Sequence, residues 1–115
     1  MFHQPPPPRP LVSVVIPVKD DAGPLEHCLR GLSRQSIALE EIIVVDNGSR
    51  DASAAVARAH GATVITCGAP GIAAAASAGY DAARGEVILR LDADRPTFGP
   101  QPFFALKTRD DRYLH

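Results

Sequence analysis

Two carboxylates stand one residue apart at the end of an apolar run, in the stretch VILRLDAD at positions 87–94. In extended backbone, residues i and i+2 point the same way, so Asp92 and Asp94 should converge. Converging carboxylates repel each other unless a cation or hydrogen-bond donors neutralise them. Mg²⁺ or Mn²⁺ prefers oxygen ligands, and a diphosphate would complete its coordination. This D-x-D spacing also occurs in solvated loops, but its place after a buried strand favours a metal–diphosphate site.

A second polar segment, VVDNGSRDAS at positions 44–53, also follows an apolar run. Asp46 stands where that run stops, and Asn47-Gly48 predicts a turn. Ser49 or Asp51 is expected to cap the next helix. Asp46 could simply accept a hydrogen bond from its own turn. A carboxylate at a buried strand end is also well placed to bind a base or a sugar, and we favour that role.

The elements that would position these side chains alternate along the chain. Continuous apolar runs suit strands covered on both faces, and they lie at 11–18, 41–46, 62–67 and 86–92. Amphipathic or alanine-rich stretches predict helices at 24–35, 51–60 and about 72–84, the last two ended by Gly61 and Gly85. This order predicts an α/β fold, a Rossmann-like three-layer sandwich with a mostly parallel sheet. Ligands bind beyond the carboxyl ends of such strands, so one cleft should gather 17–21, 46–49, 68–71 and 92–94.

The composition of the 115 residues is that of an ordinary globular protein, with 45% hydrophobic and 22% charged residues. A net charge of -1, few aromatics and no Trp argue against a nucleic-acid partner. No apolar run approaches the length of roughly 18 residues that would span a membrane, and we expect no signal peptide. Cys28 and Cys67 lack metal-ligand spacing and are expected to be buried thiols, which favours a cytoplasmic protein, free or membrane-associated through a partner.

Three regions are expected along the chain. Residues 1–10, MFHQPPPPRP, predict a disordered proline-rich leader in preference to a ligand for an SH3-type domain. Residues 11–96 form the expected domain. Residues 97–115 are an atypical C-terminal tail, in which Asp110 and Asp111 are expected to be solvated.

The motifs together resemble the family-2 glycosyltransferases, which have the GT-A fold. That resemblance covers residues 11–96, the nucleotide-sugar-binding half of the fold, so the chain would be a truncated GT-A fold. It rests on VSVVIPVKDD, EIIVVDNGSRDAS, GIAAAASAGYDAARGE and the metal-binding motif LDAD, in the family's order and spacing. The resemblance implies metal-assisted transfer of a sugar, with inversion, from a nucleotide-diphosphate sugar to an acceptor hydroxyl.

The resemblance also implies roles for residues at the strand ends. Asp46 and Asn47 would lie near the base and ribose of the donor. Asp92 would lie near the ribose and donor sugar, and Asp94, with Asp92, would hold Mg²⁺ or Mn²⁺ at the diphosphate. The remaining implied donor-binding residues are Pro17, Val18, Lys19, Gly71 and Ala93.

Three departures from the family's pattern qualify the expected activity. Many members have a second Asp where this chain has Asn47, and an Arg-Asn pair where it has Ala76-Ser77. The family's acceptor-binding half, with its general base, would follow the metal motif, but only 21 residues follow Asp94 here. We therefore expect an incomplete donor-binding portion, whose catalytic base is not among these residues.

Other interpretations remain open at the level of the sequence. The chain could instead be a non-catalytic GT-A-like module for protein association. A nucleotidyltransferase is disfavoured, because IPVKDDAGP lacks a glycine-rich phosphate loop. A four-stranded sheet would leave an edge unpaired, which predicts a homodimer or a partner chain that completes the fold, with Phe98, Phe103 and Phe104 as contacts.

Overall fold

The computed structural model describes residues 11–34, 39–94, 104–108 and 113–114. Strands and helices alternate from β1 (Val12–Val18) and α1 (Ala22–Ser33) to β2 (Leu39–Asp46) and α2 (Ser53–Ala59). They continue with β3 (Thr63–Thr66), α3 (Ile72–Ala82) and β4 (Val87–Leu91). Two more strands, β5 (Phe104–Thr108) and β6 (Tyr113–Leu114), complete the described elements. The expected alternation over residues 11–94 is confirmed.

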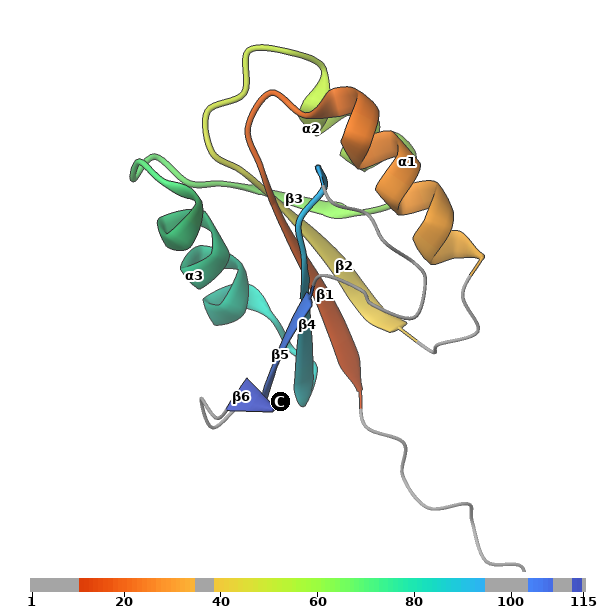
Figure 1. Cartoon of the computed structure of the whole chain (residues 1–115), viewed down its shortest axis with the longest axis vertical. Helices are drawn as coiled ribbons and strands as arrows, with labels where there is room; N and C mark the ends of the chain where they lie inside the picture. The colour runs from red at the N-terminus through yellow and green to blue at the C-terminus, as the bar shows by residue number, and fades with distance from the viewer. Residues whose placement is uncertain (1–10, 35–38, 95–103, 109–112, 115) are drawn as a thin grey trace, which may run out of the picture.

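The sheet has the strand order β3-β2-β1-β4-β5-β6. The first four strands are parallel, while β5 is antiparallel to β4 and β6 is antiparallel to β5. Helices α1 and α2 cover one face and α3 covers the other, which gives three layers (Figure 1). The predicted α/β sandwich with a mostly parallel sheet is therefore confirmed.

Alternation along β1 explains how one strand serves two cores. Val14, Ile16 and Val18 pack into the cluster beneath α1 and α2, with Leu25 and Leu29 among their neighbours in that cluster. Val15 belongs to the opposite cluster, beneath α3. Successive side chains of a strand point to opposite faces, so a continuous apolar run is what a doubly covered strand requires.

Helix α3 lies unusually close to the sheet because of Gly79. A Cβ atom placed on Gly79 would lie 2.3 Å from Cγ1 of Val15. The neighbouring buried residues Ala75 and Ala76 also have small side chains. The small side chains of this alanine-rich helix predict close packing against the sheet, and the contacts at Gly79 confirm it.

A polar network connects the amino-terminal ends of the central strands with the segment after α3. The Ser13 hydroxyl donates to Oε2 of Glu41 (2.8 Å), and its oxygen accepts from Gly85 N–H (2.8 Å). Glu41 also accepts from Arg84 N–H (2.6 Å) and forms an ion pair with Nε of Arg84 (3.4 Å). Burial raises the pKa of Glu41, but these hydrogen bonds and the Arg84 charge outweigh it and lower the pKa overall.

Gly85 does not have its predicted role at the end of α3. The helix ends at Ala82, and Gly85 has no left-handed φ. A Cβ atom there would lie 2.6 Å from Oγ of Ser13 and 2.7 Å from the Leu11 carbonyl oxygen, so the position needs glycine for close approach. Gly61, by contrast, follows α2 with φ +80°, as a helix-ending glycine should.

The predicted unpaired edge at β4 is wrong, because β5 pairs with β4 along its whole length from Val87 to Leu91. The stretch FALKT supplies this strand from the region expected to be an atypical C-terminal tail. Phe104 begins β5, whereas Phe98, Phe103, Asp110, Asp111 and the leader 1–10 lie outside the described residues.

The two thiols differ in burial. Cys28, on the inner face of α1, is fully buried, as predicted. That burial raises the pKa of its thiol to about 11. The prediction is wrong for Cys67, which is partly exposed just after the edge strand β3, where its thiol donates to the Ala69 carbonyl oxygen (3.7 Å). Across the described segments, no helix has the length and apolar character to cross a membrane.

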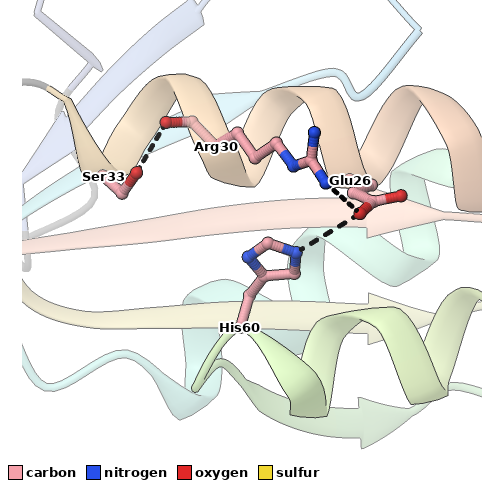
Figure 2. Close-up of polar contacts among 4 residues, drawn as sticks. All are labelled: Glu26, Arg30, Ser33 and His60. Carbon is pink, nitrogen blue, oxygen red and sulfur yellow. Dashed lines mark hydrogen bonds and ion pairs between the residues drawn. The ribbon is translucent and has the colours of Figure 1, made fainter.

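A surface cluster links α1 to the end of α2 (Figure 2). Glu26 pairs with Arg30 one turn along α1 (2.9 Å), and Nε2 of His60 lies 3.9 Å from the same carboxylate. The Ser33 hydroxyl donates to the Arg30 carbonyl oxygen (2.7 Å). Exposed pairs of this kind contribute little free energy. The place of His60 at the end of a helix predicts a surface residue, and the structure confirms it.

Candidate functional site

A cavity of about 320 Å³ opens at the carboxyl ends of β1 and β4. Its described lining comes from both strand ends, from the loop after β1 and from the first residue of α3, and consists of Pro17, Asp21, Ile72, Arg90, Asp92 and Asp94. These segments meet at the upper edge of the sheet in Figure 1, between α1 and α3. The cavity thus lies where ligands bind in open parallel sheets.

Strand alternation directs these side chains to the cavity. On β4, Ile88 packs beneath α3, and Arg90 and Asp92 follow it at intervals of two residues. Leu91 and Ala93 pack beneath α1 and α2, so the alternation continues past the last residue of β4. Asp94 lies in a turn instead of the extended backbone expected, but it lines the same cavity as Asp92.

Three carboxylates share this cavity, those of Asp21, Asp92 and Asp94. Burial raises the pKa of Asp21, and the negative charge of Asp94 raises it further. The ion pair of Arg90 with Asp92 offsets part of this negative charge. Such a cluster favours a bound cation.

The loop that carries Asp21 is fastened to the loop after β2. Asp20 has a left-handed φ of 55°, and its Oδ1 accepts from the backbone N–H groups of Arg50 (2.6 Å) and Asp51 (3.3 Å). In return, Asp20 N–H donates to the Ser49 hydroxyl (2.9 Å) and Asp21 N–H donates to the Ser53 hydroxyl (3.2 Å). Four residues distant in sequence therefore hold the loop that carries Asp21.

The predicted capping residues serve this junction as well. Asp51 accepts from the N–H of Ser53, the first residue of α2 (2.9 Å), and from the N–H of Ala22, the first residue of α1 (3.0 Å). Asp51 therefore satisfies a free N–H group of α2, as expected, and one of α1, although the N-cap residues of these helices are Ala52 and Asp21. The capping prediction is wrong for Ser49, whose hydroxyl oxygen is used by Asp20.

Asn47 and Asp46 build the neighbouring loops. Asn47 is 8% exposed, and its amide nitrogen donates to the carbonyl oxygens of Cys67 (3.1 Å) and Ala69 (2.7 Å). Oδ1 of Asp46 accepts from Ser49 N–H (2.8 Å), which is the turn interaction considered from the sequence. Neither residue is among the described lining of the cavity, and their contact with a donor remains a prediction.

The cavity brings together Pro17, Asp92 and Asp94 from the predicted site residues. The side chains of Val18 and Ala93 lie in the core beneath α1 and α2, because strand alternation turns them away from the cavity. Their contact with a donor stays a prediction, and it would involve the backbone. Lys19 and Gly71 are exposed but are not part of the described lining.

Sequence reasoning missed Asp21 and Ile72 as site residues, and it does not decide whether Arg90 reaches into the cleft or lies at an edge of the sheet. Asp21 stood within the predicted strand-end segment 17–21, and Ile72 directly follows Gly71, which has φ +103°. Arg90 was a charged residue in an apolar strand two positions before Asp92, and that spacing was the available signal.

The residues present fit a divalent ion that is only partly coordinated by protein. Within residues 11–34 and 39–94 and the two short strands, no three His, Cys, Asp or Glu side chains are grouped so as to hold an ion by themselves. Asp92 and Asp94 offer oxygen ligands at one cavity wall, and the remaining positions would be filled by water and ligand phosphates. Mg²⁺ is commonly bound in this way.

Comparison with known proteins agrees with this arrangement. Residues 13–95 match the family described as Glycosyl transferase family 2. The chain is 39% identical over 97 residues to undecaprenyl-phosphate 4-deoxy-4-formamido-L-arabinose transferase of Pseudomonas aeruginosa, covering 76% of this chain and 29% of that protein.

Two solved structures share the fold. Mannosyl-3-phosphoglycerate synthase of Rubrobacter xylanophilus superposes with a TM-score of 0.69 at 30% identity, over 80% of this chain and 33% of that one. Glucosyl-3-phosphoglycerate synthase of Mycobacterium tuberculosis, solved with Mn²⁺, UDP-glucose and phosphoglyceric acid, gives a TM-score of 0.66 at 25% identity, over 73% and 33% of the two chains.

The chain spans about a third or less of the length of these proteins. Apart from Val12, the matched region nevertheless contains all four parallel strands, the three helices and the described lining of the cavity. By the extent of this match, the chain belongs to glycosyl transferase family 2.

Proposed function

We propose that the chain is the donor-binding portion of a glycosyltransferase. In this proposal it binds a nucleotide-diphosphate sugar with Mg²⁺ or Mn²⁺, for transfer of the sugar to an acceptor hydroxyl with inversion. The observation that carries the proposal is the cavity at the ends of β1 and β4, where Asp21, Asp92 and Asp94 gather. Its volume of about 320 Å³ lies near the lower end of the usual range for small-molecule sites.

The carboxylates have distinct roles in this proposal. Asp94, with Asp92, holds the divalent ion against the diphosphate, and the bound ion would neutralise the charge of the leaving nucleoside diphosphate. Asp92 also faces the ribose and donor sugar. Pro17 lines the same cavity from the end of β1. Contacts to the base and ribose are assigned to the loops that carry Lys19, Asp46, Asn47 and Gly71.

The comparisons support a nucleotide-diphosphate donor. The mycobacterial synthase was solved with Mn²⁺ and UDP-glucose, and it shares the fold over 73% of this chain. UDP is therefore the first nucleotide to test. The acceptor site and the general base are not assigned to any described residue, so the proposal covers donor binding, and transfer requires an acceptor-binding part.

Calorimetric titration with UDP, dTDP and GDP, each with and without Mn²⁺, tests the proposal. We expect one nucleotide to bind in the presence of the metal. Asp92→Asn and Asp94→Asn should each weaken that binding at least about tenfold, because each removes a charged ligand. Asp81→Asn is the matched control, because Asp81 is an exposed residue of α3 outside the described cavity lining.

The same titration separates the alternative function. Binding of no nucleotide at millimolar concentration, by a protein shown to be folded, would contradict donor binding. The family's fold would then serve protein association, the second interpretation of the sequence.

A further inference from the structure

Arg90 occupies an unusual place for a cation, within the fourth strand of a buried parallel sheet. It pairs with Val15 of β1 on one side and with Ala105 of β5 on the other. Its side chain is 26% exposed and lines the cavity beside Asp92. A buried parallel strand such as β4 ordinarily has a hydrophobic residue at such a position.

The guanidinium is under-used by the described residues. Arginine has five N–H donors, and here Nη2 of Arg90 donates a hydrogen bond to Oδ1 of Asp92 (3.2 Å). The Nε atom is buried and has no hydrogen-bond partner in the part of the chain that the structure describes. Burying an unsatisfied donor costs free energy, so a native protein that retains one has a reason for it.

The charges around Arg90 indicate what that reason is. The described lining holds three carboxylates, and Arg90 is the only cationic side chain among them. The three carboxylates repel an anionic ligand that enters the cavity. Attraction to the Arg90 guanidinium offsets that repulsion. Its planar array of donors matches phosphate oxygens, which it can bind through two parallel hydrogen bonds.

We propose that Arg90 binds the diphosphate of the donor directly and gives the site an affinity for that group that does not depend on a metal. The ion pair with Asp92 holds the guanidinium at the cavity wall when no donor is bound. When a diphosphate binds, the remaining N–H groups donate to its oxygens. This inference rests on the proposed function, because it assigns a second phosphate-binding element to the same site.

The first experiment measures anion binding without nucleotide or metal. Pyrophosphate is titrated into the full chain in EDTA, and the side-chain Nε–H signals of arginine are followed by NMR. The Arg90 signal is identified by its absence in Arg90→Lys, and a buried Nε–H exchanges slowly enough with water to be observed. We expect a saturable shift of this signal, and no shift at millimolar pyrophosphate would overturn the inference.

The second experiment measures nucleotide affinity in Arg90→Leu and Arg90→Lys, with Arg58→Leu as the matched control. Arg58 is an exposed residue of α2 outside the described lining. We expect Arg90→Leu to lose about 10- to 100-fold in affinity for the nucleotide diphosphate with Mn²⁺, and Arg90→Lys to lose less, because lysine keeps the charge without the paired donors. Thermal unfolding of each variant checks that it is folded.

The outcomes distinguish this inference from the proposed function. Equal metal-dependent affinity in the wild type and in folded Arg90→Leu would overturn the role of Arg90 and leave donor binding intact. A saturable pyrophosphate shift without binding of any nucleotide would support the anion site and contradict the nucleotide donor. An unfolded Arg90→Leu leaves Arg90→Lys and the NMR titration to decide.

Discussion

Adjacent aspartates after β1 have opposite effects on the stability of the fold. Asp20 fixes the loop junction by accepting two backbone hydrogen bonds. Asp21 presents its carboxylate to the cavity, where burial and the charge of Asp94 raise its pKa. The contribution of Asp21 to stability is largest at low pH and is lost as the pH rises through its raised pKa. At neutral pH the ionised Asp21 carboxylate therefore lowers the free energy of unfolding.

Replacing Asp21 should therefore stabilise the protein. We expect Asp21→Asn to raise the free energy of unfolding at pH 7 by less than about 1 kcal/mol, since the site is partly solvated. Asp20→Ala, the neighbouring control, should lower it by about 0.5–2 kcal/mol through loss of the loop hydrogen bonds. Urea denaturation measures the free energy of unfolding of both variants. Equal destabilisation by the two would show that the charge of Asp21 does not destabilise the protein.

Glu41, at the amino-terminal ends of the strands, makes stability depend on pH in the direction opposite to that of Asp21. Its pKa is lowered from the usual value of 4.5, so its stabilising effect is present above that value and is lost as the pH falls through the folded pKa. We expect Glu41→Gln to cost about 1–3 kcal/mol at pH 7. The difference from the wild type should shrink in acid, as measured by urea denaturation between pH 7 and pH 3. A difference that does not change with pH would contradict this assignment.

At the scale of elements, the site depends on how closely α3 and the loops approach the sheet. Gly79 lets α3 pack on β1 and β2, since its missing Cβ would contact Val15 and Val45. The same helix begins at Ile72, in the cavity wall. The packing of α3 therefore sets the position of that wall relative to Arg90 and Asp92.

Substitution of Gly79 tests this packing. We expect Gly79→Ala to destabilise the protein by about 1–3 kcal/mol, because the added methyl group would lie 2.3 Å from Cγ1 of Val15. Gly23→Ala is the control, since Gly23 lies in α1 with nothing within 4 Å of an added Cβ, and it should destabilise the protein less than Gly79→Ala does.

A double-mutant cycle completes the test of Gly79. Combining Gly79→Ala with Val15→Ala should cost less than the sum of the two single changes, because the smaller side chain makes room for the new methyl group. Strict additivity in urea denaturation would mean that the contact with Val15 does not limit the approach of α3.

At the scale of the whole molecule, local patterns predicted the elements and missed the junctions between them. Apolar runs and helical periodicity gave the four parallel strands and three helices, and the strand-end rule brought Pro17, Asp92 and Asp94 together. Asp21 is positioned by hydrogen bonds to residues about thirty positions away, which no local spacing encodes. Gly85 was assigned to a helix end because its contact with Ser13 spans 72 residues.

The edge of the sheet shows the same limit. Pairing between strands is non-local, so FALKT gave no sign that it would lie against β4. With β4 paired, the outer strands are β3 and the two-residue β6. Short edge strands resist edge-to-edge association, so the main reason for predicting self-association is weakened, and the homodimer stays a prediction.

The central claim is that the cavity at the ends of β1 and β4 holds a divalent ion together with a nucleotide diphosphate. Substoichiometric Mn²⁺ added with UDP broadens the NMR signals of nearby amides and therefore locates the ion. We expect the amides of Asp21, Ile72, Asp92 and Asp94 to broaden first, and Asp94→Asn to remove the effect. Broadening centred on Glu26 or Glu41, or unchanged in Asp94→Asn, would contradict it.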